Sequence, residues 1–161
     1  TDSPPALLSY GAKVELISKK NSRWVDYDQF HLGYKKLEKK NDELIKTIRL
    51  PRAKSKRHHY YRKVGTRKAQ AISKVVMAAC AETMGGKISD VKIAYGSVAP
   101  ISLRCQKVEA MLKGQKTKGL DMSKIRKALA GEITPIDDIR STKDFRLDVA
   151  QNLLEEFLLG L

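Results

Sequence analysis

The histidines, cysteines and paired acids of this sequence are the side chains that could serve a metal or catalytic site. His58-His59 are adjacent, and neighbouring residues of a strand point to opposite faces, which prevents them from chelating one metal ion. Cys80 and Cys105 have no nearby histidine and cannot supply the four ligands of a structural zinc or iron–sulfur site. Asp137-Asp138 precede an expected helix start, where acidic side chains are favourable. We therefore predict no catalytic residue and no metal site, and we interpret the cysteines as buried free thiols of a reducing cytoplasm.

The charge of the chain points to an anionic partner. The 161 residues carry a net charge of +14 and a mean hydropathy of −0.42, and no apolar run is long enough to span a membrane. Between Arg52 and Lys74 there are nine lysines and arginines and no acid. Nucleic acid is the disfavoured interpretation, because no helix-turn-helix, zinc-finger or RNA-recognition pattern accompanies the run. Tyr60 and Tyr61 would also face opposite ways in a strand and could not form one stacking platform. An anionic cofactor and an acidic partner protein would each account for the basic run.

The first third of the chain predicts short elements that end at a linker. The apolar periodicity and the turn residues indicate a helical turn, a hairpin, a short helix and a further strand, which Pro51 ends. A domain boundary is expected at the linker. The expected elements are a helical turn at 4–10, strands at 14–18 and 23–25, a short helix within 26–36, a strand at 44–50 and a linker at 53–56.

The remaining chain predicts helices packed on an antiparallel sheet, which is an α+β fold. Helical spacing of apolar residues predicts a long helix over 67–83, which Thr66 would cap and Gly85-Gly86 would end. A last helix over 145–161, with its start at Ser141, is expected to bury one side of its surface. The side chains expected on that buried side are Phe145, Val149, Leu153 and Phe157. The other expected elements are strands at 59–64 and 91–95 and helices at 105–112 and 122–129.

The order of several motifs resembles the flavin subunit of the molybdenum hydroxylases, which include xanthine dehydrogenase, aldehyde oxidase and carbon monoxide dehydrogenase. The resemblance runs through the whole chain, but the glycine-rich loops that begin the family's FAD domain do not occur in it. We therefore expect a fragment or one chain of a split subunit. The motifs are 2–8 (DSPPALL), 11–16 (GAKVEL), 42–45 (DELI), 61–72 (YRKVGTRKAQAI), 93–100 (IAYGSVAP), and 132–142 (EITPIDDIRST) followed by Phe145-Arg146.

The resemblance implies both an architecture and a role. Residues 1–52 would be the C-terminal remnant of the FAD-binding domain, and residues 53–161 the C-terminal α+β domain of the flavoprotein. The implied role is an electron relay that passes electrons from iron–sulfur centres through FAD to an acceptor. Its partners would be the iron–sulfur subunit, the molybdenum subunit that holds the molybdenum cofactor, and the N-terminal part of the FAD domain. The location expected from the cysteines, the cytoplasm, is compatible with this role.

Three positions would meet FAD if the resemblance holds, and each has an ordinary alternative. Asp2 would hydrogen-bond the cofactor, or it is simply a turn residue. Ile45 would line the ring pocket, or it is ordinary core. Lys63 would lie near the ring and favour its anionic reduced form, or it is one cation in the basic run. Two other functions also stay open for the whole chain: a scaffold domain that only docks the iron–sulfur and molybdenum subunits, and a basic nucleic-acid-binding module.

Overall fold

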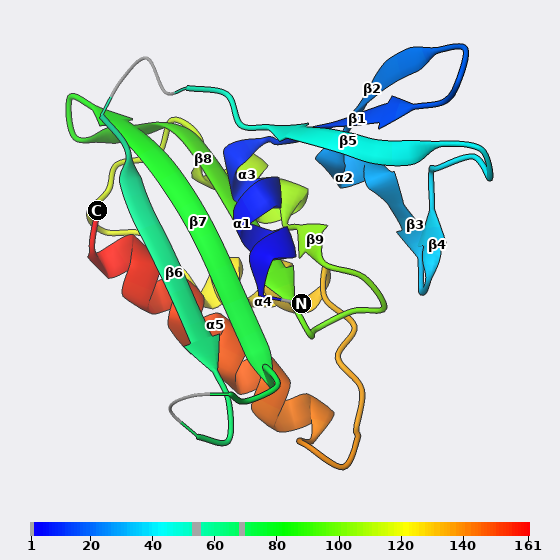
Figure 1. Ribbon diagram of the computed structural model, residues 1–161. Coiled ribbons are helices and arrows are strands. Elements are labelled where there is room, and N and C mark those ends of the chain that lie inside the picture. Colours follow the sequence, from blue (N-terminus) through cyan, green and yellow to red (C-terminus); the bar gives the residue numbers. More distant parts are fainter. Residues whose placement is uncertain (1, 53–55, 68–69) are drawn as a thin grey trace.

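The computed structural model describes residues 2–52, 56–67 and 70–161. Within these ranges the strands form a four-stranded sheet, a three-stranded sheet and a two-stranded hairpin, all antiparallel (Figure 1). Together with the helices, this confirms the predicted α+β class. The elements are α1 (Ser3–Tyr10), β1 (Lys13–Ile17), β2 (Ser22–Asp26), α2 (Tyr27–Phe30), β3 (His31–Gly33), β4 (Lys36–Leu37), β5 (Leu44–Arg49), β6 (His58–Val64), β7 (Val75–Met84), β8 (Lys87–Gly96), β9 (Leu103–Arg104), α3 (Gln106–Leu112), α4 (Met122–Ala130) and α5 (Lys143–Leu159).

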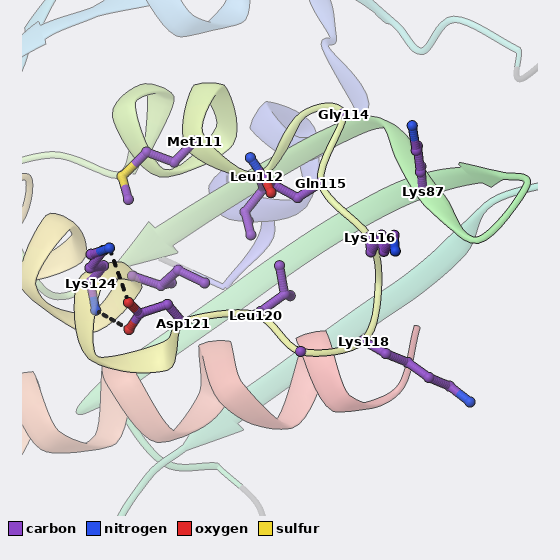
Figure 2. Close-up of a pocket in the computed structure, with 12 residues that line it drawn as sticks. Lys87, Met111, Leu112, Gly114, Gln115, Lys116, Lys118, Leu120, Asp121 and Lys124 are labelled. Atoms are coloured by element: carbon purple, nitrogen blue, oxygen red, sulfur yellow. Dashed lines mark hydrogen bonds and ion pairs between the residues drawn. The ribbon is translucent and has the colours of Figure 1, made fainter.

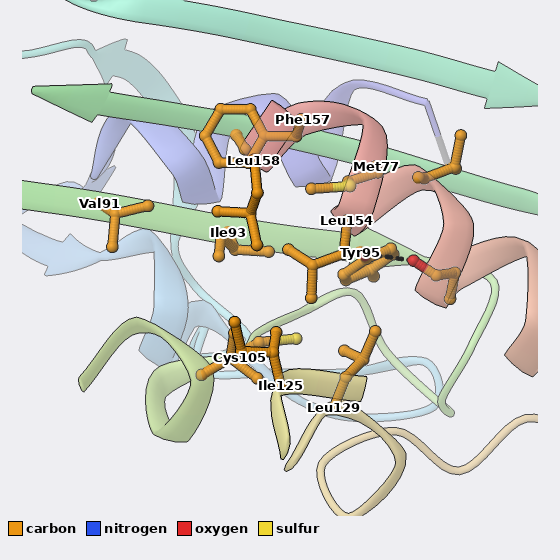
Figure 3. Packing of buried hydrophobic residues seen from close by; sticks show 14 of the residues in the cluster. Met77, Val91, Ile93, Tyr95, Cys105, Ile125, Leu129, Leu154, Phe157 and Leu158 are labelled. Carbon is orange, nitrogen blue, oxygen red and sulfur yellow. Dashed lines mark hydrogen bonds between the residues drawn. The ribbon is translucent and has the colours of Figure 1, made fainter. Parts of the chain in front are cut away.

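The larger sheet has the strand order β6–β7–β8–β9 and is covered on both faces. Helices α3, α4 and α5 pack on one face, where Met77 and Tyr95 join the main hydrophobic core (Figures 1 and 3). The Tyr95 hydroxyl donates a hydrogen bond to the Ala150 carbonyl of α5 at 2.7 Å. Helix α1 packs on the opposite face, where the Cys80 thiol donates to the Ser9 carbonyl at 3.0 Å. The sheet is therefore the middle layer of three.

The helix predicted over 67–83 is wrong, because the apolar part of that segment is strand β7. Residues 75–81 are all buried, since one set of side chains meets α5 and the alternate set meets α1. A strand buried on both faces has a continuous apolar run, and periodicity cannot distinguish such a run from a buried helix. Thr66 consequently precedes no helix within the part of this segment that the structure describes.

Gly85-Gly86 form the two-residue turn of a hairpin between β7 and β8, and do not end a helix. Their φ angles are 58° and 72°, and Met84 pairs with Lys87 across the turn. Positive φ at both central positions is the geometry of a type I′ turn, which suits the twist of a hairpin and strongly favours glycine. The glycine pair was therefore a hairpin signal.

The first part of the chain folds largely as predicted. Strands β1 and β2 form the expected hairpin, and β5 pairs with the other edge of β1 to give the order β2–β1–β5. The expected short helix is α2, which is followed by the β3–β4 hairpin. Of the predicted linker, residues 53–55 lie outside the described residues, so the domain boundary remains a prediction.

Helix α5 begins and packs slightly differently from the prediction. Its N-cap is Thr142, whose hydroxyl accepts a hydrogen bond from the Phe145 amide, and not Ser141. Leu153 and Phe157 are buried as expected, but Val149 is only partly buried and Phe145 is 41% exposed. Successive i+4 steps rotate by about 40° around a helix, so a long i+4 series cannot keep one direction. Phe145 has therefore turned away from the core.

Helix α1 binds tightly to the sheet of the second half of the chain. At Gly96, the last residue of β8, an added Cβ would lie 2.8 Å from Val76 Cγ1 and 3.1 Å from Pro5 Cγ of α1. These distances leave no room for a side chain, so α1 rests against bare backbone. The close approach brings Asp2, the residue before α1, next to the larger sheet.

Candidate functional site

Asp2 and Lys63, which the sequence analysis named separately, form one ion pair. The Lys63 ammonium on β6 donates to the Asp2 carboxylate at 2.5 Å, although 61 positions separate the two residues. The Lys63 side chain is 29% exposed and the Asp2 side chain is 43% exposed, so both charges remain partly accessible. The hydrogen bond from Lys63 is the main cause that lowers the pKa of Asp2.

Two further hydroxyl groups hold Asp2 in place. Ser73, which is buried, donates from Oγ to the second carboxylate oxygen of Asp2 at 2.6 Å. Tyr61 donates from its hydroxyl to the Asp2 backbone carbonyl at 3.3 Å. Ser73 is not among the residues predicted for the site, because it falls inside the helix predicted over 67–83. No local motif marks Ser73, and only the fold brings it to Asp2.

The exposed face of β6 carries the other polar groups of this region. His59, Tyr61 and Lys63 alternate along the strand on the side of α1, and the His59 ring nitrogen Nδ1 lies 3.1 Å from the Tyr10 hydroxyl. Tyr60 points to the other face and packs against Phe157, with 5.6 Å between the ring centroids. The predicted opposite orientation of Tyr60 and Tyr61 is therefore confirmed.

The basic run is partly neutralised by carboxylates from other elements. Arg57 binds Glu82 of β7 at 2.6 Å, and Arg62 lies 3.4 Å from Glu156 of α5. With Lys63 on Asp2, three cations of the run already have acidic partners within the chain. Nowhere in the described parts of the chain do three or more His, Cys, Asp or Glu side chains gather as a metal site would require.

A cavity of about 480 Å³ adjoins Ser73. Its lining includes Ile72, Ser97, Ile136 and the buried Arg146 of α5. A larger cavity of about 570 Å³ lies elsewhere, beside α3 and α4. Figure 2 shows lysine side chains around that second cavity, but none of the residues implied for FAD lines it. Asp2, Ile45 and Lys63 do not line the smaller cavity either, and that cavity touches the candidate site through Ser73.

Ile45 lies apart from the other two predicted residues. It is on β5 of the smaller sheet, whereas Lys63 is on the larger one, and it is 48% exposed. The alternative that Ile45 is ordinary core is therefore wrong for this chain. Leu44 and Ile48 of β5, and Leu50 directly after it, are similarly exposed, so this segment presents several uncovered apolar side chains.

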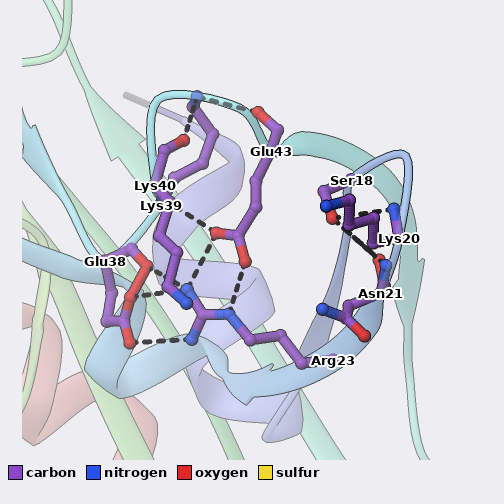
Figure 4. A network of polar contacts seen from close by, with 8 residues as sticks. All are labelled: Ser18, Lys20, Asn21, Arg23, Glu38, Lys39, Lys40 and Glu43. Carbon is purple, nitrogen blue, oxygen red and sulfur yellow. Dashed lines mark hydrogen bonds and ion pairs between the residues drawn. The ribbon is translucent and has the colours of Figure 1, made fainter.

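A charged network fixes the loop that leads into β5. Arg23 of β2 binds Glu43 at 2.7 Å and Glu38 at 2.8 Å, and the Lys40 amide donates to Glu43 at 2.8 Å (Figure 4). The hydrogen bond from Arg23 is the main cause that lowers the pKa of Glu43 to about 2. Because Glu43 precedes β5 directly, the network sets where Ile45 enters the sheet.

None of the helices in the described ranges combines the length and apolar character needed to cross a lipid bilayer.

Comparisons with known proteins agree with the resemblance. Residues 59–161 match the family model of the CO dehydrogenase flavoprotein C-terminal domain, and residues 1–53 match the FAD binding domain in molybdopterin dehydrogenase. A xanthine dehydrogenase FAD-binding subunit of Escherichia coli O157:H7 is 28% identical over 161 residues, which cover 98% of this chain and 54% of that protein. The glyceraldehyde dehydrogenase medium chain of Sulfolobus acidocaldarius is 27% identical, with 95% and 54% covered.

Two solved structures are similar to this chain in fold. A carbon monoxide dehydrogenase from Hydrogenophaga pseudoflava matches with a TM-score of 0.90 and 25% identity over 97% of this chain and 54% of that one. The quinoline 2-oxidoreductase of Pseudomonas putida 86 shares the fold, with a TM-score of 0.84 at 21% identity, over 99% of this chain and 55% of that one. The chain spans about half the length of these relatives. It belongs to the FAD-binding subunits of the molybdenum hydroxylase family.

Proposed function

We propose that this chain supplies part of the flavin site of an electron-transfer subunit, which passes electrons from iron–sulfur centres through FAD to an acceptor. The observation that carries the proposal is the contact between Asp2 and Lys63. One residue comes from the segment that matches an FAD-binding domain, and the other from the segment that matches the flavoprotein C-terminal domain. Two residues implied for the same cofactor thus meet in space.

The groups at this site suit FAD chemically. A carboxylate accepts hydrogen bonds from hydroxyl groups such as those of the ribityl chain, and an ammonium group stabilises negative charge on a reduced ring. Both side chains are accessible enough to reach a ligand. When bound, FAD supplies the redox chemistry, while Asp2 and Lys63 bind, orient and set the local charge.

We propose that the rest of the cofactor site comes from protein that this chain does not include. Ile45 would then be covered on assembly, which would explain why an apolar side chain assigned to a ring pocket is exposed here. The iron–sulfur and molybdenum subunits, with the molybdenum cofactor, are the proposed partners. The two free, buried cysteines fit a reducing cytoplasm.

The exposed apolar side chains of β5 also favour a second candidate function. A domain that only docks the other subunits would need such a surface, and it would not need Asp2 or Lys63 to meet any ligand. The two functions differ in what Lys63 does, so a variant of Lys63 separates them.

The test is the visible spectrum and FAD affinity of the complete subunit, purified with its partner subunits. We expect the absorption bands of bound flavin, and weaker FAD binding in Lys63→Ala than in the parent. Lys20→Ala, in the β1–β2 turn, is the control because Lys20 is exposed and distant in the fold. A colourless complex, or equal FAD affinity of the parent and both variants, would contradict the proposal and favour the docking function.

A further inference from the structure

Ser73 lies at the point where the candidate site meets the core of the larger domain. It is 4% exposed, and its hydroxyl donates to Asp2 at 2.6 Å. Among the described residues, a partly exposed lysine donates to one oxygen of this carboxylate and a buried serine to the other. An exposed ion pair alone can adopt many geometries and is weakly held. A donor fixed in the core restricts the orientation of the carboxylate.

The backbone next to Ser73 is fixed from two sides. The Lys74 amide donates to the Val64 carbonyl at the end of β6, at 2.8 Å. The Lys74 carbonyl accepts from Arg146 of α5 at 2.9 Å. Val64 follows Lys63 directly, so the same hydrogen bond links the segments that carry the two donors to Asp2.

Arg146 is itself held firmly in the core. It is 4% exposed, and besides Lys74 it donates to the Ser97 carbonyl at 2.7 Å and to the Asp138 carboxylate at 2.8 Å. Ser97 has a φ of 67°, an unusual conformation for a serine that the contact with Arg146 helps to maintain. The arginine therefore ties α5, the end of β8 and the start of β7 together beside Ser73.

From this geometry we propose that Ser73 is a positioning residue for the flavin site: its hydroxyl orients the Asp2 carboxylate toward Lys63. The effect of Ser73 on FAD binding rests on the proposed function, whereas its effect on the orientation of the Asp2 carboxylate does not. Ser73 does not need to touch the cofactor, because it acts through Asp2.

The first experiment needs no cofactor and uses the chain as described. Carboxyl ¹³C NMR of Asp2 is followed through an acid titration in the parent, Ser73→Ala and Ser73→Thr. The titratable groups that face Asp2 include Lys63 and Tyr61, the charge of the N-terminus also lowers the pKa of Asp2, and the hydrogen bond from Ser73 is the second cause of that lowering. We expect Ser73→Ala to raise the pKa of Asp2 toward the ordinary value, and Ser73→Thr, which keeps the hydroxyl, to restore it.

The matched control is Ser89→Ala, which removes an exposed hydroxyl that donates to the Glu82 carbonyl at 3.0 Å. It should leave the titration of Asp2 unchanged. If Ser73→Ala, folded by circular dichroism, titrates like the parent and like Ser89→Ala, the positioning role is overturned.

The second experiment measures the FAD dissociation constant of the complete subunit. Because Ser73 acts on FAD only through Asp2, Ser73→Ala should weaken FAD binding by roughly three- to tenfold, which is less than the loss of a direct hydrogen bond to a charged group would cause, with recovery in Ser73→Thr. If Lys63→Ala weakens FAD binding while Ser73→Ala does not, this inference fails and the proposed function stands. If neither variant changes FAD binding while the Asp2 titration shifts, the proposed function fails and the positioning stands.

Discussion

The Asp2–Lys63 pair predicts a specific pattern of flavin reduction potentials in a double-mutant cycle. Lys63→Ala removes a cation and leaves the Asp2 carboxylate uncompensated, which disfavours the anionic reduced ring and lowers the potential. Asp2→Asn removes the anion and leaves Lys63 uncompensated, which raises the potential. The double variant removes both charges, so its potential should lie closer to the parent than that of either single variant.

The interaction of each charge with the reduced ring sets the size of these shifts, and a charge in contact with the ring bounds it from above. Two unit charges about 4 Å apart interact by about 4 kcal/mol at an effective dielectric constant of about 20. The two side chains are 29% and 43% exposed, so solvent reduces the interaction to about 1–3 kcal/mol. For a two-electron couple this corresponds to about 20–60 mV, downward for Lys63→Ala and upward for Asp2→Asn.

The assay is a spectroelectrochemical titration of the flavin in the complete subunit, with Lys20→Ala as the control for simple loss of one positive charge. Lys20 lies in the turn between β1 and β2, away from the site. The reasoning is refuted if both single variants titrate with the parent. It is also refuted if the double variant shifts as far as Lys63→Ala alone.

Four further outcomes follow from the fold. Leu154 is fully buried and Phe145 is 41% exposed, so Leu154→Ala should lower the free energy of unfolding, measured in urea, by about 2–5 kcal/mol. Phe145→Ala should lower it by under ~1 kcal/mol. Equal losses in the two variants would contradict the packing of α5. The pKa of Glu43 is lowered from 4.5 to about 2. Its carboxylate therefore stabilises the fold fully above pH 4.5 and loses this effect as the pH falls toward about 2. Between these two pH values the urea midpoint should fall more steeply in the parent than in Glu43→Gln. Burial raises the pKa of Cys80 and Cys105, so both thiols should react with Ellman's reagent only after denaturation, and rapid reaction of the native protein would contradict their burial. Single-stranded DNA should show no sub-micromolar binding at physiological salt in a filter assay, and tight binding would favour the nucleic-acid function.

Local signals in the sequence were sufficient for several short elements, although they did not predict the β3–β4 hairpin or strand β9. Turn residues between alternating apolar residues predicted the β1–β2 hairpin, and Pro51 correctly marked the end of β5. The helices α3 and α4 followed from apolar spacing. These elements bury only one side, so their patterns retain a clear period. Strand β7 has no such period, because α1 covers one of its faces from a distant part of the chain.

The site was only partly predictable for a related reason. The resemblance identified Asp2 and Lys63 as separate positions, but no property of either residue indicates that they touch. Their contact depends on α1 packing across the larger sheet, which in turn needs Gly96. Ser73 carries no motif and becomes relevant only through its place beside Asp2. Long-range packing therefore decided the part of the site that the sequence pattern could not reveal.

The packing of Pro5 against Gly96 also bears on how such subunits can be recombined. Helix α1 belongs by sequence to the segment that matches the FAD-binding domain, yet it forms one outer layer of the other segment's sheet. A chimera joined at the boundary between the two matched segments would therefore place a foreign helix on that sheet. Residues 59–161 keep this sheet covered only together with α1, and a graft that omits the helix would leave a buried face of the sheet open to water.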